Sequence, residues 1–445
     1  MIRVILATVF MFFMTNTCLL FSDSELALEK SFAIQQVTLK NGMKIFLKPT
    51  VFEPGEISVN LIAEGGFSLL DEAKRGSGEL AAQVAWESGL GNLTSDQLSV
   101  LLYEHSIEFN AQIKPFSRSI EASSDVKDFP ELLKLIRMYF TEQNFNEEAF
   151  QTVMQEKKTS LNMPKNDQKL LFEDSYKVLN TQNYHFLKPF KQKYVDNADL
   201  NVLKDFFQFA FGDPSSFVAV IVGNFDPKSL LSLLDETLGS IPAKHHPLAS
   251  AKPPLPSFPK GVTTKAVTYS GRKDSLARLT FPLSKEMEQG DFHLFDLSVR
   301  IFENKLRETL TKQFKSSHSV TVSYELPLYP LLKSPWMVIQ YRAEPKKVAE
   351  VHQVIIKTLK DYQAGGATHE ELAKCETTIS KNEEYWLKDN DYWLATLSNY
   401  ALWGWDTNTI KAHPPGTESH SPAHLKKVFE SYLPINNYTW IYSQP

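Results

Sequence analysis

The sequence predicts an α+β fold with two similar domains, each an antiparallel-rich sheet packed by helices. Three observations lead to this prediction. Strand-like alternation and helical spacing occur in successive runs, which argues against a parallel doubly wound sheet. A proline-rich stretch at 243–261 divides the chain. The order of elements before this stretch recurs after it, at a spacing of roughly 220 residues.

The first domain is expected at 32–242 and opens with two strands, at 35–49 and 57–65. In the first strand, apolar residues alternate on both sides of Asn41-Gly42, a pair that favours a two-residue hairpin turn. The segment 77–89 is predicted to be a helix, because its apolar residues recur at helical spacing. These residues are Leu80, Ala81, Val84 and Ala85.

The remaining elements of the first domain follow from the same patterns. Alternation around Pro115 predicts two strands within 107–125, and the apolar run 217–223 predicts a buried strand. Thr94 or Ser95 is a suitable cap for the first of the further helices. These helices are expected at 94–106, 129–141, 146–161, 170–180, 199–211 and 227–238.

The stretch 243–261 is expected to be an extended linker, because its prolines exclude a helix interior. The second domain is then expected at 262–445. Thr368 and Glu371 form a capping-box pattern at the start of its last long helix. If that helix is continuous, its aromatic residues share one stripe, which we interpret as core packing. The strands are predicted at 262–269, 277–282, 319–326 and 336–342, and the helices at 291–310, 345–363 and 368–393.

The N-terminal segment 1–22 carries Arg3, then an apolar run and a polar flank, the pattern of a secretory signal peptide. An uncleaved anchor is the alternative interpretation. We therefore expect an exported protein, periplasmic or secreted, without membrane contact after cleavage. Once the signal and Cys18 are removed, Cys375 has no intrachain disulfide partner. The net charge of −5, without a basic run, gives no indication of a nucleic-acid partner.

Several stretches together resemble the pitrilysin/insulinase family of inverted-motif zinc peptidases. They are LKNGMKIFLKPT at 39–50, the Gly65-Gly66 pair, GELAAQVAWESGLGNL at 78–93, FNEEAF at 145–150, and VAVIVGNFDPKSLLSLLDETLGSIP at 218–242. The resemblance implies one half of a clamshell-shaped peptidase. The segments SGLGNL and LRE are closest in character to the metal-free, C-terminal-type half.

The zinc motif of that family is missing. Active members carry H-x-x-E-H on the helix that corresponds to 77–89. When Gly78 is set on the glycine before the motif, Ala81, Val84 and Ala85 occupy the His, Glu and His positions. None of these three side chains can bind a metal or accept a proton. We therefore predict no catalytic residue and no metal ligand in this chain.

The resemblance supplies two candidate substrate-binding residues, Arg307 and His318. In the family, an Arg in an L-R-E segment and a Tyr seven residues later reach across the cleft to the substrate. Here the seventh residue is Phe314, and a short insertion would bring His318 to that position instead. The fixed fork of donors in Arg307 suits a peptide carbonyl or carboxylate. The alternative role is a helix-terminal cation near the negative end of the dipole.

These observations lead to one main hypothesis. The chain is expected to be a non-catalytic subunit of an exported zinc peptidase, closing the peptide chamber opposite a zinc-bearing partner of the same family. Zinc is expected in that partner and no cofactor in this chain. Two alternatives remain open: an active zinc endopeptidase in its own right, and a peptide-binding or assembly protein that has lost catalysis.

Overall fold

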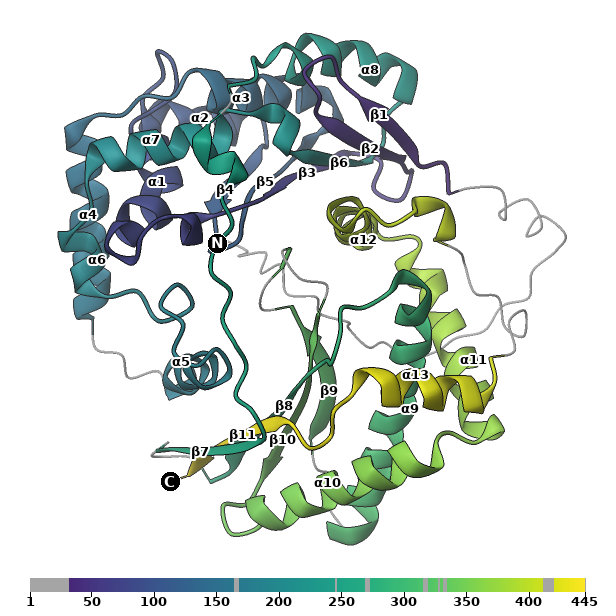
Figure 1. The fold of residues 1–445 in the computed structure, drawn as a ribbon. Coiled ribbons are helices and arrows are strands. Elements are labelled where there is room, and N and C mark those ends of the chain that lie inside the picture. Colours follow the sequence, from purple (N-terminus) through teal and green to yellow (C-terminus); the bar gives the residue numbers. More distant parts are fainter. Residues whose placement is uncertain are drawn as a thin grey trace, which may run out of the picture.

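The computed structural model describes residues 32–163, 168–244, 246–268, 273–314, 319–326, 329–330, 334–410 and 420–444. The predicted signal peptide at 1–22 lies outside these residues. Two sheets, each with its own set of helices, form two lobes joined by an extended segment (Figure 1). In the described part of the chain, no helix is long and apolar enough to cross a membrane.

The first lobe is built on a six-stranded sheet. The hairpin predicted at Asn41-Gly42 is confirmed, with β1 antiparallel to β2 and Gly42 at a φ of 89°. The predicted two-residue turn is wrong, because the backbone bond from Leu39 to Met43 encloses three residues, Lys40 to Gly42. Among the described strands of this sheet, only β2 and β6 pair in parallel, and all other neighbours are antiparallel. The strands in spatial order are β1 (Gln35–Thr38), β2 (Lys44–Pro49), β6 (Val218–Gly223), β3 (Glu56–Glu64), β5 (Ser117–Asp125) and β4 (Glu108–Ile113).

The described strands of the second lobe repeat this topology without an equivalent of β1. The only parallel pair among them, β7 with β11, occupies the place of β2 with β6. Equivalent strands begin 212 to 220 residues apart: 262 − 44, 275 − 56, 320 − 108, 336 − 117 and 438 − 218. The α+β prediction and the internal repeat are thus confirmed. The strands in order are β7 (Val262–Thr268), β11 (Tyr438–Gln444), β8 (Ser275–Pro282), β10 (Trp336–Ala343) and β9 (Val320–Glu325).

The helices of each lobe pack mainly on one face of its sheet (Figure 1). In the first lobe these are α1 (Arg75–Glu87), α2 (Ser95–Glu104), α3 (Phe129–Thr141), α4 (Glu147–Asn162), α6 (Gln192–Asp196), α7 (Leu200–Phe211) and α8 (Pro227–Glu236). In the second they are α9 (Gln289–Phe314), α10 (Val348–Gly365), α11 (His369–Trp386) and α13 (Pro422–Tyr432). Thr94, one of the two expected caps, begins α2 with a capping box, and the capping box predicted at Thr368 is present.

One predicted helix, 368–393, is wrong as a continuous element. The chain turns after α11, and a new helix, α12 (Asn390–Trp403), begins where the Asp389 side chain accepts the backbone N–H of Tyr392. Apolar spacing continues across the turn and conceals it, whereas an Asp at an N-cap is the local signal for a new start. Trp386 and Trp393 therefore lie on different helices.

One helix from each lobe packs on the sheet of the other lobe. α12 packs on β2, β3 and β6, where Trp393 is fully buried in a cluster with Phe46 and Val220. In the opposite direction, α5 (Gln168–Asn180) packs on β7 and β11 of the second sheet (Figure 1). The two helices follow α4 and α11, which are equivalent positions in the repeat. This exchange holds the lobes together.

Polar contacts reinforce the α5 side of the exchange. The Arg278 guanidinium on β8 forms two 2.7 Å hydrogen bonds to the two oxygens of Glu173, a bidentate pair. The Tyr176 hydroxyl donates to Glu325 at 2.7 Å, and Thr439 donates to Asn180. Arg278, Glu325 and Thr439 belong to the second sheet, so α5 is fixed to three of its strands.

His352 is a buried histidine in the second core. Its side chain on α10 is 6% exposed and stacks on the Trp440 ring, with centroids 4.1 Å apart. The Tyr438 hydroxyl lies 3.2 Å from its Nε2. Burial lowers the pKa of His352 to about 4, because the charged imidazolium would lose its hydration.

We expect the free energy of unfolding to fall as the pH is lowered from about 6.5 to about 4. Between these pH values, His352 is protonated in the unfolded chain but remains neutral in the folded chain. Lowering the pH therefore stabilises the unfolded state relative to the folded state. The contribution of His352 to the free energy of unfolding is about 3 kcal/mol above pH 6.5, and it is lost as the pH falls to about 4. Urea unfolding at several pH values measures it. His352→Phe should remove this component, whereas His424→Phe, at an exposed position on α13, should retain it. If the free energy of unfolding fell equally with pH in the wild type and in His352→Phe, His352 would not be the group responsible.

Candidate functional site

The site that the family resemblance points to is α1. Its first turn lies close to the backbone of Tyr194 at Gly76 and to the side chains of Leu70 and Phe67 at Gly78, which favours glycine at both positions. A Cβ on Gly76 would lie 1.8 Å from the carbonyl oxygen of Tyr194, and one on Gly78 would lie 2.8 Å from the Phe67 Cβ. The GSG sequence therefore allows the helix to enter the first core at close range.

The three predicted ligand positions lie in the apolar core. Ala81, Val84 and Ala85 are each 0% exposed and belong to one cluster with residues of α3, α4 and α7. A metal at this face would have no nitrogen or oxygen donors from these side chains. Among the described residues, no group of three or more His, Cys, Asp or Glu side chains is arranged to hold a metal ion. This face of α1 serves packing.

Arg75 at the start of α1 escaped the sequence analysis. It is 3% exposed, and it pairs with Glu79 at 2.8 Å. Its guanidinium also donates to the carbonyl oxygens of His185 and Lys188, at 2.6 and 3.0 Å. These partners are backbone groups or a neighbour on the same helix, so Arg75 anchors α1 to the segment before α6.

Arg307 lies on the surface of α9. Its side chain is 44% exposed and donates to Glu303 Oε1 at 2.6 Å. The helix was predicted to end at 310, but it continues to Phe314, seven residues after Arg307. Since the dipole acts only within the last turn, the helix-terminal explanation for Arg307 does not apply. Phe314 is partly buried against the second core, and His318 lies outside the described residues.

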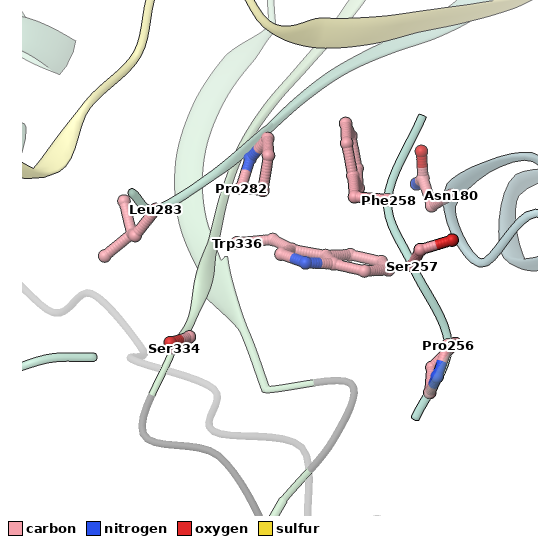
Figure 2. A pocket seen from close by; sticks show the side chains of 8 residues that line it. All are labelled: Asn180, Pro256, Ser257, Phe258, Pro282, Leu283, Ser334 and Trp336. Carbon is pink, nitrogen blue, oxygen red and sulfur yellow. The ribbon is translucent and has the colours of Figure 1, made fainter. Parts of the chain in front are cut away.

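A small pocket lies where the lobes and the connecting segment meet (Figure 2). Its volume is about 100 Å³. The end of α5, the connecting segment, and the adjacent ends of β8 and β10 contribute its lining. The lining residues are Asn180, Pro256, Ser257, Phe258, Pro282, Leu283, Ser334 and Trp336. Sequence analysis could not have found it, because no motif marks these positions.

Comparison with known proteins agrees with this architecture. Residues 197–378 match the family model described as the peptidase M16 inactive domain. The chain is 23% identical over 376 residues to a "Zinc protease PQQL-like" protein of Arabidopsis thaliana, covering 81% of this chain and 37% of that protein. It is 21% identical over 376 residues to the "Probable zinc protease PqqL" of Haemophilus influenzae, covering 80% and 40%.

Solved structures share the fold at low identity. The periplasmic protease PqqL from Escherichia coli superposes with a TM-score of 0.75 at 17% identity, over 94% of this chain and 46% of that one. The peptidase M16 inactive domain from Pseudomonas fluorescens gives a TM-score of 0.75 at 13% identity, over 93% and 98%. The chain thus spans about two fifths of the length of the curated relatives named above.

The fold is that of the solved peptidase M16 inactive domain, and α1 carries Ala81, Val84 and Ala85 at the three positions of the zinc motif. Residues 197–378 match the M16 peptidase domain that is described as inactive, so the chain resembles the M16, or pitrilysin/insulinase, peptidases. The resemblance predicted from the sequence is confirmed.

Proposed function

We propose that this chain is the non-catalytic half of an exported zinc metallopeptidase and forms one wall of its peptide chamber. The observation that carries the proposal is the state of α1, where all three positions of the inverted zinc motif hold buried apolar side chains. Catalysis then requires a second half that supplies the zinc and the H-x-x-E-H helix. The relatives named as zinc proteases are more than twice as long as their matched region, which leaves room for such a half.

The proposed location is the periplasm or the cell exterior. The signal-like segment 1–22 supports export, and one relative of the same fold is named a periplasmic protease. The proposed substrate is a peptide held between the two halves.

The proposal is tested by purifying the tagged chain from its own cells. A second polypeptide, or a second half of one longer polypeptide, should carry H-x-x-E-H, and the assembly should cleave an unstructured peptide until a chelator is added. Recovery of the chain free of any zinc-bearing half, in a form that itself cleaves the peptide, would contradict the proposal and favour the active-enzyme alternative.

We further propose that Arg307 holds the peptide from this wall. Its guanidinium is exposed and is oriented by Glu303, an acid whose burial raises its pKa despite the nearby Arg307. Arg307→Ala should lower kcat/KM of the assembled pair by about tenfold or more, because misplacement of a substrate by about 1 Å costs on the order of a hundredfold. Assembly should be unaffected.

Lys312→Ala is the matched control, since Lys312 is on the same helix, 81% exposed, and pairs with Glu308 across one turn. Its activity should equal that of the wild type. Equal kcat/KM values for Arg307→Ala and Lys312→Ala, measured at saturating partner concentration, would remove Arg307 from the site.

A further inference from the structure

The pocket between the lobes has aromatic and proline walls. The rings of Phe258 and Trp336 meet edge to face, with centroids 5.4 Å apart and planes at 70°. In Figure 2, the flat face of Trp336 runs across the pocket toward Ser257, and Pro256 and Pro282 lie at opposite ends. Faces of this kind bind aliphatic and proline side chains by stacking and apolar contact.

These walls are held in place by bonds between distant parts of the chain. Gln182 donates to the carbonyl oxygen of Phe258 at 3.2 Å, and the Tyr184 hydroxyl donates to that of Pro254 at 2.6 Å. Trp336 is in register with Pro282 on β8 and Glu325 on β9. The pocket is therefore formed before a ligand arrives, which lowers the entropic cost of binding.

One donor that lines the pocket has no hydrogen-bond partner among the described residues. Trp336 is 8% exposed, and its indole N–H donates to none of the described residues. In Figure 2, the indole nitrogen lies on the ring edge that faces the side of Ser334 and Pro256. An N–H at a pocket wall that is open to water can donate to a ligand instead, so a carbonyl oxygen delivered by a ligand would accept from it. None of the described lining residues is charged, which favours a neutral ligand.

The volume sets an upper limit on the ligand. A cavity of about 150 Å³ accepts benzene, and this pocket measures about 100 Å³. It therefore has room for a pyrrolidine ring or a branched aliphatic side chain, and excludes an indole.

We propose that this pocket binds one neutral apolar residue of a peptide, proline or a branched aliphatic, whose main-chain carbonyl accepts the Trp336 N–H. The proposal rests on the proposed function, because it assigns part of the peptide-binding wall to these residues. It names the class of side chain that this half of the chamber selects.

The test uses the full chain alone, labelled with 5-fluorotryptophan, with the Trp336 fluorine resonance assigned by its loss in Trp336→Phe. Titration with acetyl-Gly-Pro-Gly-amide and acetyl-Gly-Leu-Gly-amide, to roughly 10 mM, should shift the Trp336 resonance saturably. Acetyl-Gly-Glu-Gly-amide and acetyl-Gly-Trp-Gly-amide should not shift it. Ser257→Leu, at an exposed rim position, should fill the pocket and weaken binding at least tenfold. Ser99→Leu, on the exposed face of α2, should leave it unchanged.

No shift with either apolar peptide, an equal shift with the Glu peptide, or unchanged binding in Ser257→Leu would overturn the proposal. A failure of this proposal can be distinguished from a failure of the proposed function. Because no partner is added, an inactive assembled pair would refute the proposed function and leave a positive peptide titration standing. An active pair with no peptide response at Trp336 would refute only the pocket.

Discussion

Val84→Glu should destabilise the folded chain by about 3–5 kcal/mol, or prevent it from folding. Val84 is 0% exposed and is surrounded by the apolar core of the first lobe. A carboxylate there loses its hydration without gaining a partner, and the lost isopropyl group adds its own packing cost. The Glu of an H-x-x-E-H motif would occupy this same position, so the substitution asks directly whether the face could serve catalysis.

Val100→Glu is the matched control. The same substitution on α2, at a position that is 55% exposed, should change the free energy of unfolding by no more than about 0.5 kcal/mol. Urea denaturation followed by circular dichroism gives both values. If Val84→Glu proved as stable as Val100→Glu, the face of Ala81, Val84 and Ala85 would be open to water, and the structural role assigned to it would be wrong.

Arg278→Ala should cost about 2–4 kcal/mol, because it leaves the Glu173 carboxylate without its bidentate partner at a largely buried contact. The side chains of Arg278 and Glu173 are 14% and 26% exposed. Their pairing fixes α5 of the first lobe to the second sheet, so the loss falls on the contact between lobes.

Lys357→Ala provides the comparison, since Lys357 forms an ion pair with Asp361 on the surface of α10, where the side chains are 77% and 64% exposed. Solvent screens that pair, and its removal should cost less than about 0.5 kcal/mol. A loss in Arg278→Ala no larger than in Lys357→Ala would show that α5 is held by apolar contacts alone, chiefly those of Phe172 and Tyr176 with Leu276 and Ile441.

The local features of the fold could be predicted from the sequence. Asn41-Gly42 specified a hairpin, and Thr368 with Glu371 specified a helix start, because these signals act between residues a few positions apart. The end of α11 was missed, since apolar spacing continues past it into α12. The exchange of α5 and α12 between lobes could not be predicted, because it depends on contacts such as Thr50 with Asn390, 340 residues apart.

Some features of the candidate site could likewise be predicted from the sequence, and others could not. The absence of zinc ligands on α1 was readable from Ala81, Val84 and Ala85, given the family resemblance. The sequence did not reveal that the Arg75 guanidinium donates hydrogen bonds to backbone carbonyl oxygens more than 100 residues away. Nor did it reveal the pocket, whose walls meet only after Phe258 and Trp336 are brought together.

The zinc content of the purified, folded chain tests the central claim most directly. A chain whose zinc-motif helix is structural should contain far less than one equivalent of zinc after dialysis against zinc-containing buffer, and should not cleave an unstructured peptide alone. One equivalent of bound zinc, with cleavage that a chelator abolishes and added zinc restores, would contradict the assignment of this chain as the metal-free half.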